Sequence, residues 1–281
     1  MWVGIDRMSE YRVSELYYYP VKSLRGISTD ELVIERQGPV YDRRWMVVDE
    51  NNHFLTQRQA AAMALFKAEF DLPGGLILSF ADTEPCRIDI EVSLDSCALR
   101  SVTIWNDIVQ AHDMGDDAAQ WLSKHLNRQC RLVFISETTA RQIDTQYGAE
   151  GQWVGFADGF PELLIGQGSL VDLNDRLDDP ITMARFRPNI VFTGGAAFDE
   201  DSWQLIRIGN ILFDVVKPCA RCAIPNINPF SGEKGCEPWR TLASYRKVNK
   251  NIYFGQNLIH QSVGIIRVGD ELEVLHGSLG R

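Results

Sequence analysis

Two cysteines separated by two residues stand in the segment with the most chemically capable side chains, Lys217-Pro218-Cys219-Ala220-Arg221-Cys222-Ala223-Ile224-Pro225. The segment follows a predicted strand and precedes a stretch rich in Asn, Pro, Gly and Ser, which places it on a loop. An arginine next to a thiol lowers the thiol pKa and favours the thiolate, the form that attacks substrates and binds metals. A pair of buried thiols at a turn is the structural interpretation of the same residues.

Three kinds of chemistry compete for this segment. A zinc or iron–sulfur site built from Cys219, Cys222 and Cys236 lacks a second C-x-x-C pair and a pair of histidines. A thioredoxin-like dithiol normally opens a helix, and Pro225 and Pro229 oppose a helix here. The third interpretation is a single thiolate that ligates a soft, oxophilic metal carried by an organic cofactor. The spacing of the motif alone does not choose among them.

Short strands dominate the elements that must position this loop. Alternating or β-branched runs predict strands at residues 12–19, 45–48, 76–80, 87–93, 101–105, 131–135, 190–193, 204–216 and 264–275. Gly209-Asn210 and Gly269-Asp270 each predict a tight hairpin turn within the last two regions. Many short strands with few helices favour a β-barrel-rich architecture.

Helical periodicity is confined to a few segments. Residues 116–127 begin with an Asp cap and carry one apolar face, and residues 169–177 begin with a Ser cap and carry three leucines in register. Residues 60–66 are a third, short candidate.

Composition narrows the class of protein. A chain of 281 residues that is 45% hydrophobic predicts about two domains, or one large one, with a sizeable core. The net charge of −10 argues against nucleic-acid partners and anionic membrane surfaces. No apolar run is long enough to span a membrane, and residues 1–6 lack the features of a signal peptide, so we expect a cytoplasmic protein with reduced cysteines.

Short motifs in a fixed order carry a family resemblance. They are Phe186-Arg187-Pro188-Asn189-Ile190-Val191, Glu200-Asp201-Ser202-Trp203, Cys219-Ala220-Arg221-Cys222, Asn228-Pro229-x-Ser231-Gly232, Thr241-Leu242-x-Ser244-Tyr245-Arg246, Phe254-Gly255-Gln256-Asn257 and Val268-Gly269-Asp270. This set resembles the MOSC domain, the module shared with the C-terminal part of molybdenum cofactor sulfurases.

Two further motifs near the start of the chain extend the resemblance. The segments Tyr19-Pro20-Val21-Lys22-Ser23-Leu24-Arg25-Gly26 and Asp42-Arg43-Arg44-Trp45-Met46-Val47 are similar to the β-barrel module, MOSC_N, that precedes MOSC in YcbX-type proteins and mitochondrial amidoxime-reducing components. The resemblance implies a mainly β fold. We expect a β-barrel MOSC domain with a few short helices at residues 106–281. A smaller β-rich MOSC_N-like domain at residues 12–105 packs against it, and its first strand is a candidate member of the MOSC barrel.

The resemblance also implies a molybdenum cofactor, Mo-molybdopterin, with Cys222 as the protein ligand of the metal, Arg221 beside it at the catalytic centre and Cys219 in a supporting role. The residues that it places at the cofactor, or offers as candidates there, are Lys22, Ser23, Arg43, Arg44, Arg58, Arg187, Asn189 and Arg221. Physical chemistry agrees, because a dianionic phosphate needs Arg and Lys donors and a pterin edge suits an amide. If Arg43 and Arg44 lie on a strand, they face opposite sides, and only one reaches the cofactor.

The function implied by the resemblance is that of a molybdenum-dependent enzyme that reduces small N-hydroxylated compounds by cleaving the N–O bond. No cysteine follows Cys236 to hold the ferredoxin-type cluster of YcbX proteins, so we expect electrons from a separate ferredoxin- or flavoprotein-like donor. The alternative is a molybdenum cofactor or sulfur carrier in cofactor handling, in which Cys222 bears a persulfide or holds the cofactor for transfer. A structural zinc protein or a plain β-barrel interaction protein is a third interpretation.

Two further groups are ambiguous from the sequence. The acidic run Asp199-Glu200-Asp201 fits a proton relay but is more typical of a solvated loop. Trp105, Trp153 and Trp239 are candidates to border a substrate pocket, although buried aromatic residues usually fill a core.

Overall fold

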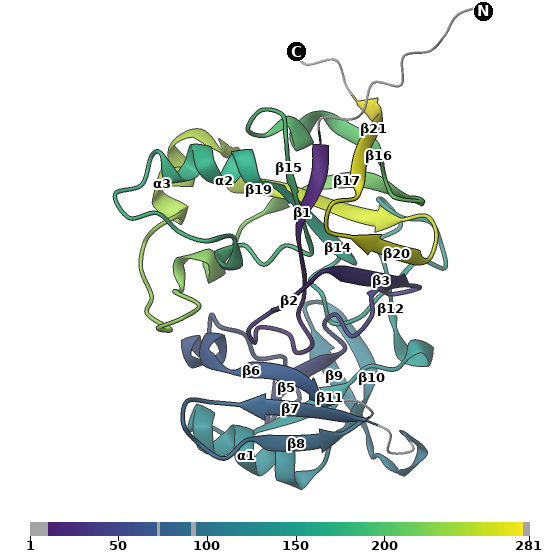
Figure 1. Ribbon diagram of the computed structural model, residues 1–281. Coiled ribbons are helices and arrows are strands. Elements are labelled where there is room, and N and C mark those ends of the chain that lie inside the picture. Colours follow the sequence, from purple (N-terminus) through teal and green to yellow (C-terminus); the bar gives the residue numbers. More distant parts are fainter. Residues whose placement is uncertain (1–10, 72–73, 91–93, 278–281) are drawn as a thin grey trace, which may run out of the picture.

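A closed β-barrel of seven strands forms the upper half of the molecule in Figure 1, in a computed structural model that describes residues 11–71, 74–90 and 94–277. In order around the barrel, the strands are β14 (Glu162–Gly166), β15 (Ile190–Thr193), β1 (Tyr11–Tyr18), β21 (Glu271–Gly277), β16 (Trp203–Ile208), β17 (Ile211–Ala220) and β19 (Asn251–His260). The pairing of β14 with β19 closes the barrel, and the β14–β15 pair alone is parallel among these seven.

Close approach of backbones explains a glycine at the closure. Gly255 on β19 has a φ of +82°, and a Cβ at this position would lie 2.8 Å from the carbonyl oxygen of Leu164 on β14. A larger residue would therefore push the closing strands apart. Side chains of the barrel strands fill the interior, as Leu16, Phe192 and Phe213 show with almost no exposed surface.

Smaller strands extend the barrel. β2 (Ile27–Thr29) pairs with β1, and β18 (Lys247–Val248) pairs with β19. β3 (Glu31–Glu35), β4 (Gly38–Pro39) and β20 (Gly264–Arg267) form a separate three-stranded sheet. The alternation of β3 sends Leu32 and Ile34 into the barrel core, while its two glutamates face solvent.

The lower half of the molecule in Figure 1 is built from residues between β1 and β14. One sheet contains β5 (Trp45–Asp49), β11 (Cys130–Phe134), β10 (Asp107–Asp113) and β9 (Leu99–Ile104); a second contains β6 (Lys67–Asp71), β7 (Gly75–Ser79) and β8 (Cys86–Asp89). A short pair, β12 (Arg141–Gln142) and β13 (Trp153–Val154), leads back to the barrel. Strand β5 is buried on both faces, because Trp45 and Val47 enter one hydrophobic cluster and Met46 and Val48 the other.

Three α-helices occur among the described residues: α1 (Asp116–Leu126), α2 (Gln167–Asn174) and α3 (Trp239–Tyr245). Short 3-10 turns lie at Ala61–Leu65, Leu94–Ser96, Glu137–Thr139, Met183–Arg185, Asp199–Ser202 and Ile224–Asn226. The helices predicted near residues 116 and 169 are confirmed, but both predicted caps are wrong. Asp116 is the first helical residue after Gly115, and Ser169 lies inside α2, where its hydroxyl donates a hydrogen bond to Glu200.

One of the two predicted hairpins is confirmed. Strands β16 and β17 pair across Gly209. The hairpin at Gly269 is wrong, because β20 pairs with β3 whereas β21 pairs with β1 and β16. Backbone groups at this turn bond to other elements instead: Gly269 N–H donates to the carbonyl of Val13, and Val13 N–H donates to that of Asp270, at 2.8 and 2.9 Å.

The mainly β fold class is confirmed, and each predicted strand region within the described residues contains one or two strands. The last three residues of the predicted strand at 87–93, and the residues read for a signal peptide, lie outside the described part. The predicted domain boundary between residues 105 and 106 falls in the turn between β9 and β10, and the division at that point stays a prediction. Within the described part, none of the helices has the length and apolar character needed to cross a membrane.

Candidate functional site

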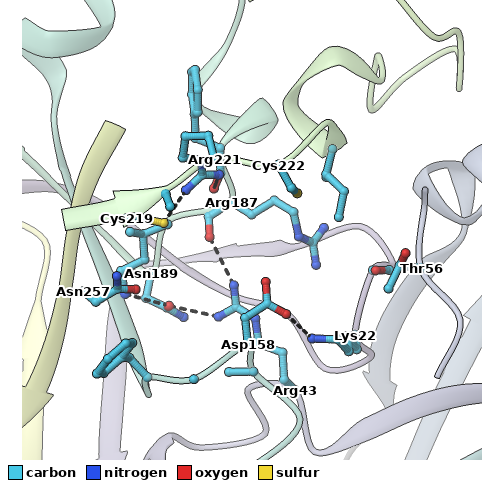
Figure 2. A pocket seen from close by; sticks show the side chains of 18 of the residues that line it. Lys22, Arg43, Thr56, Asp158, Arg187, Asn189, Cys219, Arg221, Cys222 and Asn257 are labelled. Carbon is cyan, nitrogen blue, oxygen red and sulfur yellow. Dashed lines mark hydrogen bonds and ion pairs between the residues drawn. The ribbon is translucent and has the colours of Figure 1, made fainter. Parts of the chain in front are cut away.

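A pocket between the barrel and the lower half brings together most of the predicted site residues (Figure 2). The predicted residues that line it are Lys22, Ser23, Arg43, Arg58, Arg187, Asn189, Arg221 and Cys222. Its empty space is about 790 Å³ with the open mouth included. Five of these side chains carry positive charge, whereas Asp158 and Glu162 are the acidic residues of the lining. The pocket therefore favours an anionic ligand.

The cysteine motif lies where β17 leaves the barrel. Register shifts in the β17–β19 ladder occur around Pro218, which cannot donate a backbone hydrogen bond, and the N–H of Arg221 still bonds to the carbonyl of Ile252 at 2.8 Å. The Sγ of Cys219 accepts a hydrogen bond from Arg221 at 3.0 Å. In Figure 2 the side chain of Cys222 instead points toward the space bordered by Arg187. Both thiols line the pocket, and Cys219 is the one that already accepts a hydrogen bond from Arg221.

Arg221 is held from two sides and keeps one donor free. Its Nη2 donates to the carbonyl oxygen of Phe186 at 2.7 Å, and its guanidinium lies 5.4 Å from the Phe186 ring centroid. Its Nε is buried and has no hydrogen-bond partner among the residues that the structure describes. A buried charged donor without a partner is costly, so this atom marks a position for an acceptor supplied by a ligand.

Tyr19 separates two guanidiniums of the pocket. Arg43 and Arg187 lie 4.3 and 4.2 Å from its ring centroid, and its hydroxyl donates to the carbonyl oxygen of Pro188 at 2.9 Å. Burial raises the pKa of Tyr19 to about 12, although both guanidiniums oppose the effect. Burial also lowers the pKa of Arg187 to about 10. The ring thus allows the positively charged side chains of Arg43 and Arg187 to border the same part of the pocket.

Three predicted cofactor residues have strained backbones. The φ angles of Ser23, Arg43 and Arg187 are +69°, +47° and +58°, in the left-handed region that residues with a Cβ seldom adopt. Such conformations cost about 1–3 kcal/mol each and concentrate at functional sites. The surrounding contacts hold them in place; for example, the Arg187 carbonyl accepts a hydrogen bond from Arg43 at 3.1 Å.

Lys22 is buried beneath the pocket and forms an ion pair with Asp158. Its ammonium also donates to the carbonyl oxygen of Phe156 at 2.8 Å. Burial lowers the pKa of Lys22, and Asp158 opposes the effect. The ammonium of Lys22 lowers the pKa of Asp158, whose side chain is 67% exposed to solvent. The sequence offered no signal for Asp158, whose role depends on this contact across 136 residues.

The predicted residues differ in how free they are to bind. Asn189 is buried, and its side chain already bonds to Arg43, the N–H of Leu163 and the carbonyl of Tyr17, so it organises the wall. Arg44 does not line the pocket; its Nε donates to the carbonyl of Ile135 at 3.2 Å. Between the two adjacent arginines, the structure thus places Arg43 at the site.

The remaining candidates, three tryptophans and an acidic run, differ in how they are placed. None of the three tryptophans lines the pocket, although Nε1 of Trp105 donates a hydrogen bond to Asp158, which does. The interpretation of the acidic run as a solvated loop is wrong for Glu200, which is fully buried. Its carboxylate accepts hydrogen bonds from the backbone of Gly166 and the side chain of Ser169.

A three-cysteine metal site is not assembled. Across residues 11–71, 74–90 and 94–277, no group of three or more His, Cys, Asp or Glu side chains has a metal-binding arrangement. Cys236 is exposed, and its Sγ accepts a hydrogen bond from Arg240 at 2.8 Å. Cys236 is also absent from the pocket lining.

Comparison with known proteins assigns both halves of the chain. Residues 10–129 match the MOSC N-terminal beta barrel domain, and residues 151–273 match the MOSC domain. The chain belongs to the MOSC family. Mitochondrial amidoxime-reducing component 1 of Mus musculus is 33% identical to this MOSC protein, over 94% of this chain and 82% of that one. The human protein of the same name is 31% identical over the same shares. Molybdenum cofactor sulfurase of Arabidopsis thaliana is 31% identical over 91% of this chain and 34% of its own length.

Proposed function

We propose that this MOSC protein binds Mo-molybdopterin in the cationic pocket and reduces small N-hydroxylated compounds with electrons from a separate ferredoxin- or flavoprotein-like donor. The observation that carries the proposal is the convergence of five basic side chains on one pocket that also contains the Cys222 thiol. Relatives that share about a third of the sequence are named for the reduction of amidoximes, which supports the reaction class.

The donor set of the pocket fits this cofactor. Its phosphate needs several cationic donors, and Arg187, Arg58 and the orphaned Nε of Arg221 offer them. Cys222 supplies a soft anionic ligand for molybdenum. When bound, the cofactor supplies the two-electron chemistry that breaks the N–O bond.

The residues of the chain then act by position and charge. Arg221 fixes the loop that presents Cys222, through its bonds to Cys219 and the backbone of Phe186. Asp158 forms an ion pair with the ammonium of Lys22. The ring of Tyr19 packs against the guanidiniums of Arg43 and Arg187 and fixes their positions. These contacts preorganise the site for an anion before it arrives.

The metal and pterin content of protein purified from cells that make the cofactor tests the proposal. We expect about one molybdenum and one pterin per wild-type chain, and loss of most of the molybdenum in Cys222→Ala. Cys236→Ala is the matched control, because that thiol is exposed and does not line the pocket. Wild type without molybdenum, or Cys222→Ala with a full complement, contradicts the assignment.

The similarity to molybdenum cofactor sulfurases favours a second candidate, a cofactor or sulfur carrier without reductase turnover. Reduced methyl viologen with an amidoxime discriminates between the two. The reductase consumes viologen in proportion to the amidine formed, whereas a carrier consumes none and transfers cofactor or sulfur to an acceptor protein.

A further inference from the structure

Trp105 occupies a position that β-hairpins normally give to glycine. It is the first of the two residues that connect β9 and β10, where Ile104 pairs with Asp107, and its φ is +53°. Two-residue hairpin turns that need a positive φ at this position strongly favour Gly or Asn, because a Cβ is strained there. The chain nevertheless carries its bulkiest type of side chain, and such strain concentrates where function demands it.

The indole of Trp105 extends from this turn to two residues of the cationic pocket, Asp158 and Arg58. Its Nε1 donates to Oδ1 of Asp158 at 3.3 Å, the guanidinium of Arg58 lies 4.6 Å from its ring centroid, and the Phe54 ring contacts it at 5.0 Å. These three contacts set the orientation of the indole, yet 42% of the residue stays exposed. The indole is therefore held in place with aromatic surface left uncovered.

A second cavity lies directly beside this surface. Trp105 lines it together with Tyr147 and Phe160, and its empty space is about 1,260 Å³ with the open solvent at its mouth included. It shares the segment Asp158–Phe160, Cys219, Ala220 and Asn257 with the cationic pocket, so the two cavities adjoin along one wall. A molecule that reaches from one cavity to the other would place its reactive group in the cationic pocket and its body in the second cavity.

We propose that Trp105 is a stacking platform that binds the planar, conjugated body of the substrate in this second cavity and makes the enzyme favour aryl over aliphatic amidoximes. The inference rests on the proposed function. Indole faces bind flat π-systems by offset stacking, with a gain that aliphatic groups of similar polarity do not match. Trp105 acts on specificity, while the N–O bond is broken in the cationic pocket.

Benzamidoxime and acetamidoxime test the inference, because they carry the same reactive group on an aryl and a methyl body. The variants are Trp105→Gly, Trp105→Phe and, as control, Trp239→Leu, since Trp239 is 44% exposed and lies outside both cavities. Trp105→Gly relieves the positive φ and so keeps the hairpin folded. Each variant is assayed with reduced viologen for kcat/KM, and by calorimetry for binding without reductant.

We expect the ratio of kcat/KM for benzamidoxime over acetamidoxime to fall about tenfold in Trp105→Gly through a higher KM, in line with the strength of aromatic stacking. Trp105→Phe restores part of the ratio, and Trp239→Leu leaves it unchanged. An unchanged ratio in Trp105→Gly, or an equal fall in Trp239→Leu, overturns the inference.

The binding measurement separates this inference from the proposed function. If wild type reduces neither amidoxime but binds benzamidoxime more tightly than Trp105→Gly does, the platform is supported and the reductase is contradicted. If the two proteins bind benzamidoxime equally, the platform is contradicted whatever the turnover.

Discussion

Replacement of Tyr19 tests how the cationic pocket is held together. Its ring lies between the guanidiniums of Arg43 and Arg187, and its hydroxyl bonds to the backbone of Pro188. Tyr19→Phe removes only the hydroxyl, whereas Tyr19→Leu also removes the aromatic face and leaves two partly buried positive charges without a ring between them. The two variants therefore separate the hydrogen bond from the cation–π contacts.

The structure supplies the contacts, and general magnitudes for such contacts set the expected losses of stability. A neutral buried hydrogen bond contributes about 1 kcal/mol, which sets the expected loss for Tyr19→Phe. A desolvated cation–π contact contributes about 2 kcal/mol, and both guanidiniums lie close enough to count fully. We therefore expect Tyr19→Leu to lower the free energy of unfolding by about 3–5 kcal/mol.

Urea unfolding of cofactor-free protein, followed by tryptophan fluorescence, measures both losses. Molybdenum content of the folded fraction is the second readout, and we expect it to fall in Tyr19→Leu and to be retained in Tyr19→Phe. If Tyr19→Leu is no more destabilising than Tyr19→Phe, the ring does not hold the two arginines and the reasoning about the pocket is refuted.

Two further predictions concern charged groups around the same pocket. Arg43→Gln removes most of the bound molybdenum, whereas Arg44→Gln leaves the ratio of molybdenum to folded protein unchanged, because only Arg43 lines the pocket; metal analysis of the pair checks this, and equal losses would contradict it. Burial lowers the pKa of His260, but Glu162 at 2.7 Å outweighs it, so the pKa is raised above 6.5. The stabilisation by this pair is then complete below the unfolded pKa and is lost as the pH rises through the folded one. The free energy of unfolding should decline from about pH 6.5 upward in wild type and not in His260→Gln, and identical pH profiles would refute the assignment.

The strands that the sequence predicts carry their own signal: the alternation in β16 and the apolar run of β5 follow from which faces are covered. Other strands were missed, among them β3, β14 and β19. Which strands pair with one another was harder to predict from the sequence. The residues around Gly269 are typical of a hairpin turn, but the backbone of this turn forms hydrogen bonds with β1. No local sequence pattern indicates that pairing.

The basic residues of the site were predictable through the family motifs, but the way they are held was not. Tyr19 is the first residue of one family motif, but nothing in that motif indicates that two arginines pack on its ring, and Asp158 belongs to none of the motifs. The acidic run around Glu200 predicts a solvated loop, but Glu200 is buried. Its carboxylate accepts hydrogen bonds from the N–H of Gly166 and the hydroxyl of Ser169. Each is a contact between distant segments, which composition and periodicity do not encode.

Strand β1 completes a barrel whose other six strands all come after residue 161. During synthesis this strand must wait, unpaired within the barrel, until β15 and β21 have emerged. Pairings of such long sequence separation make folding slow. When β1 pairs with its neighbours and closes the barrel, Lys22 in the following segment is brought next to the pocket residues of the barrel. The anion site therefore forms only when the barrel closes. A cofactor that binds only this closed state would therefore stabilise the folded protein against unfolding. The supply of cofactor would then set what fraction of the protein is folded.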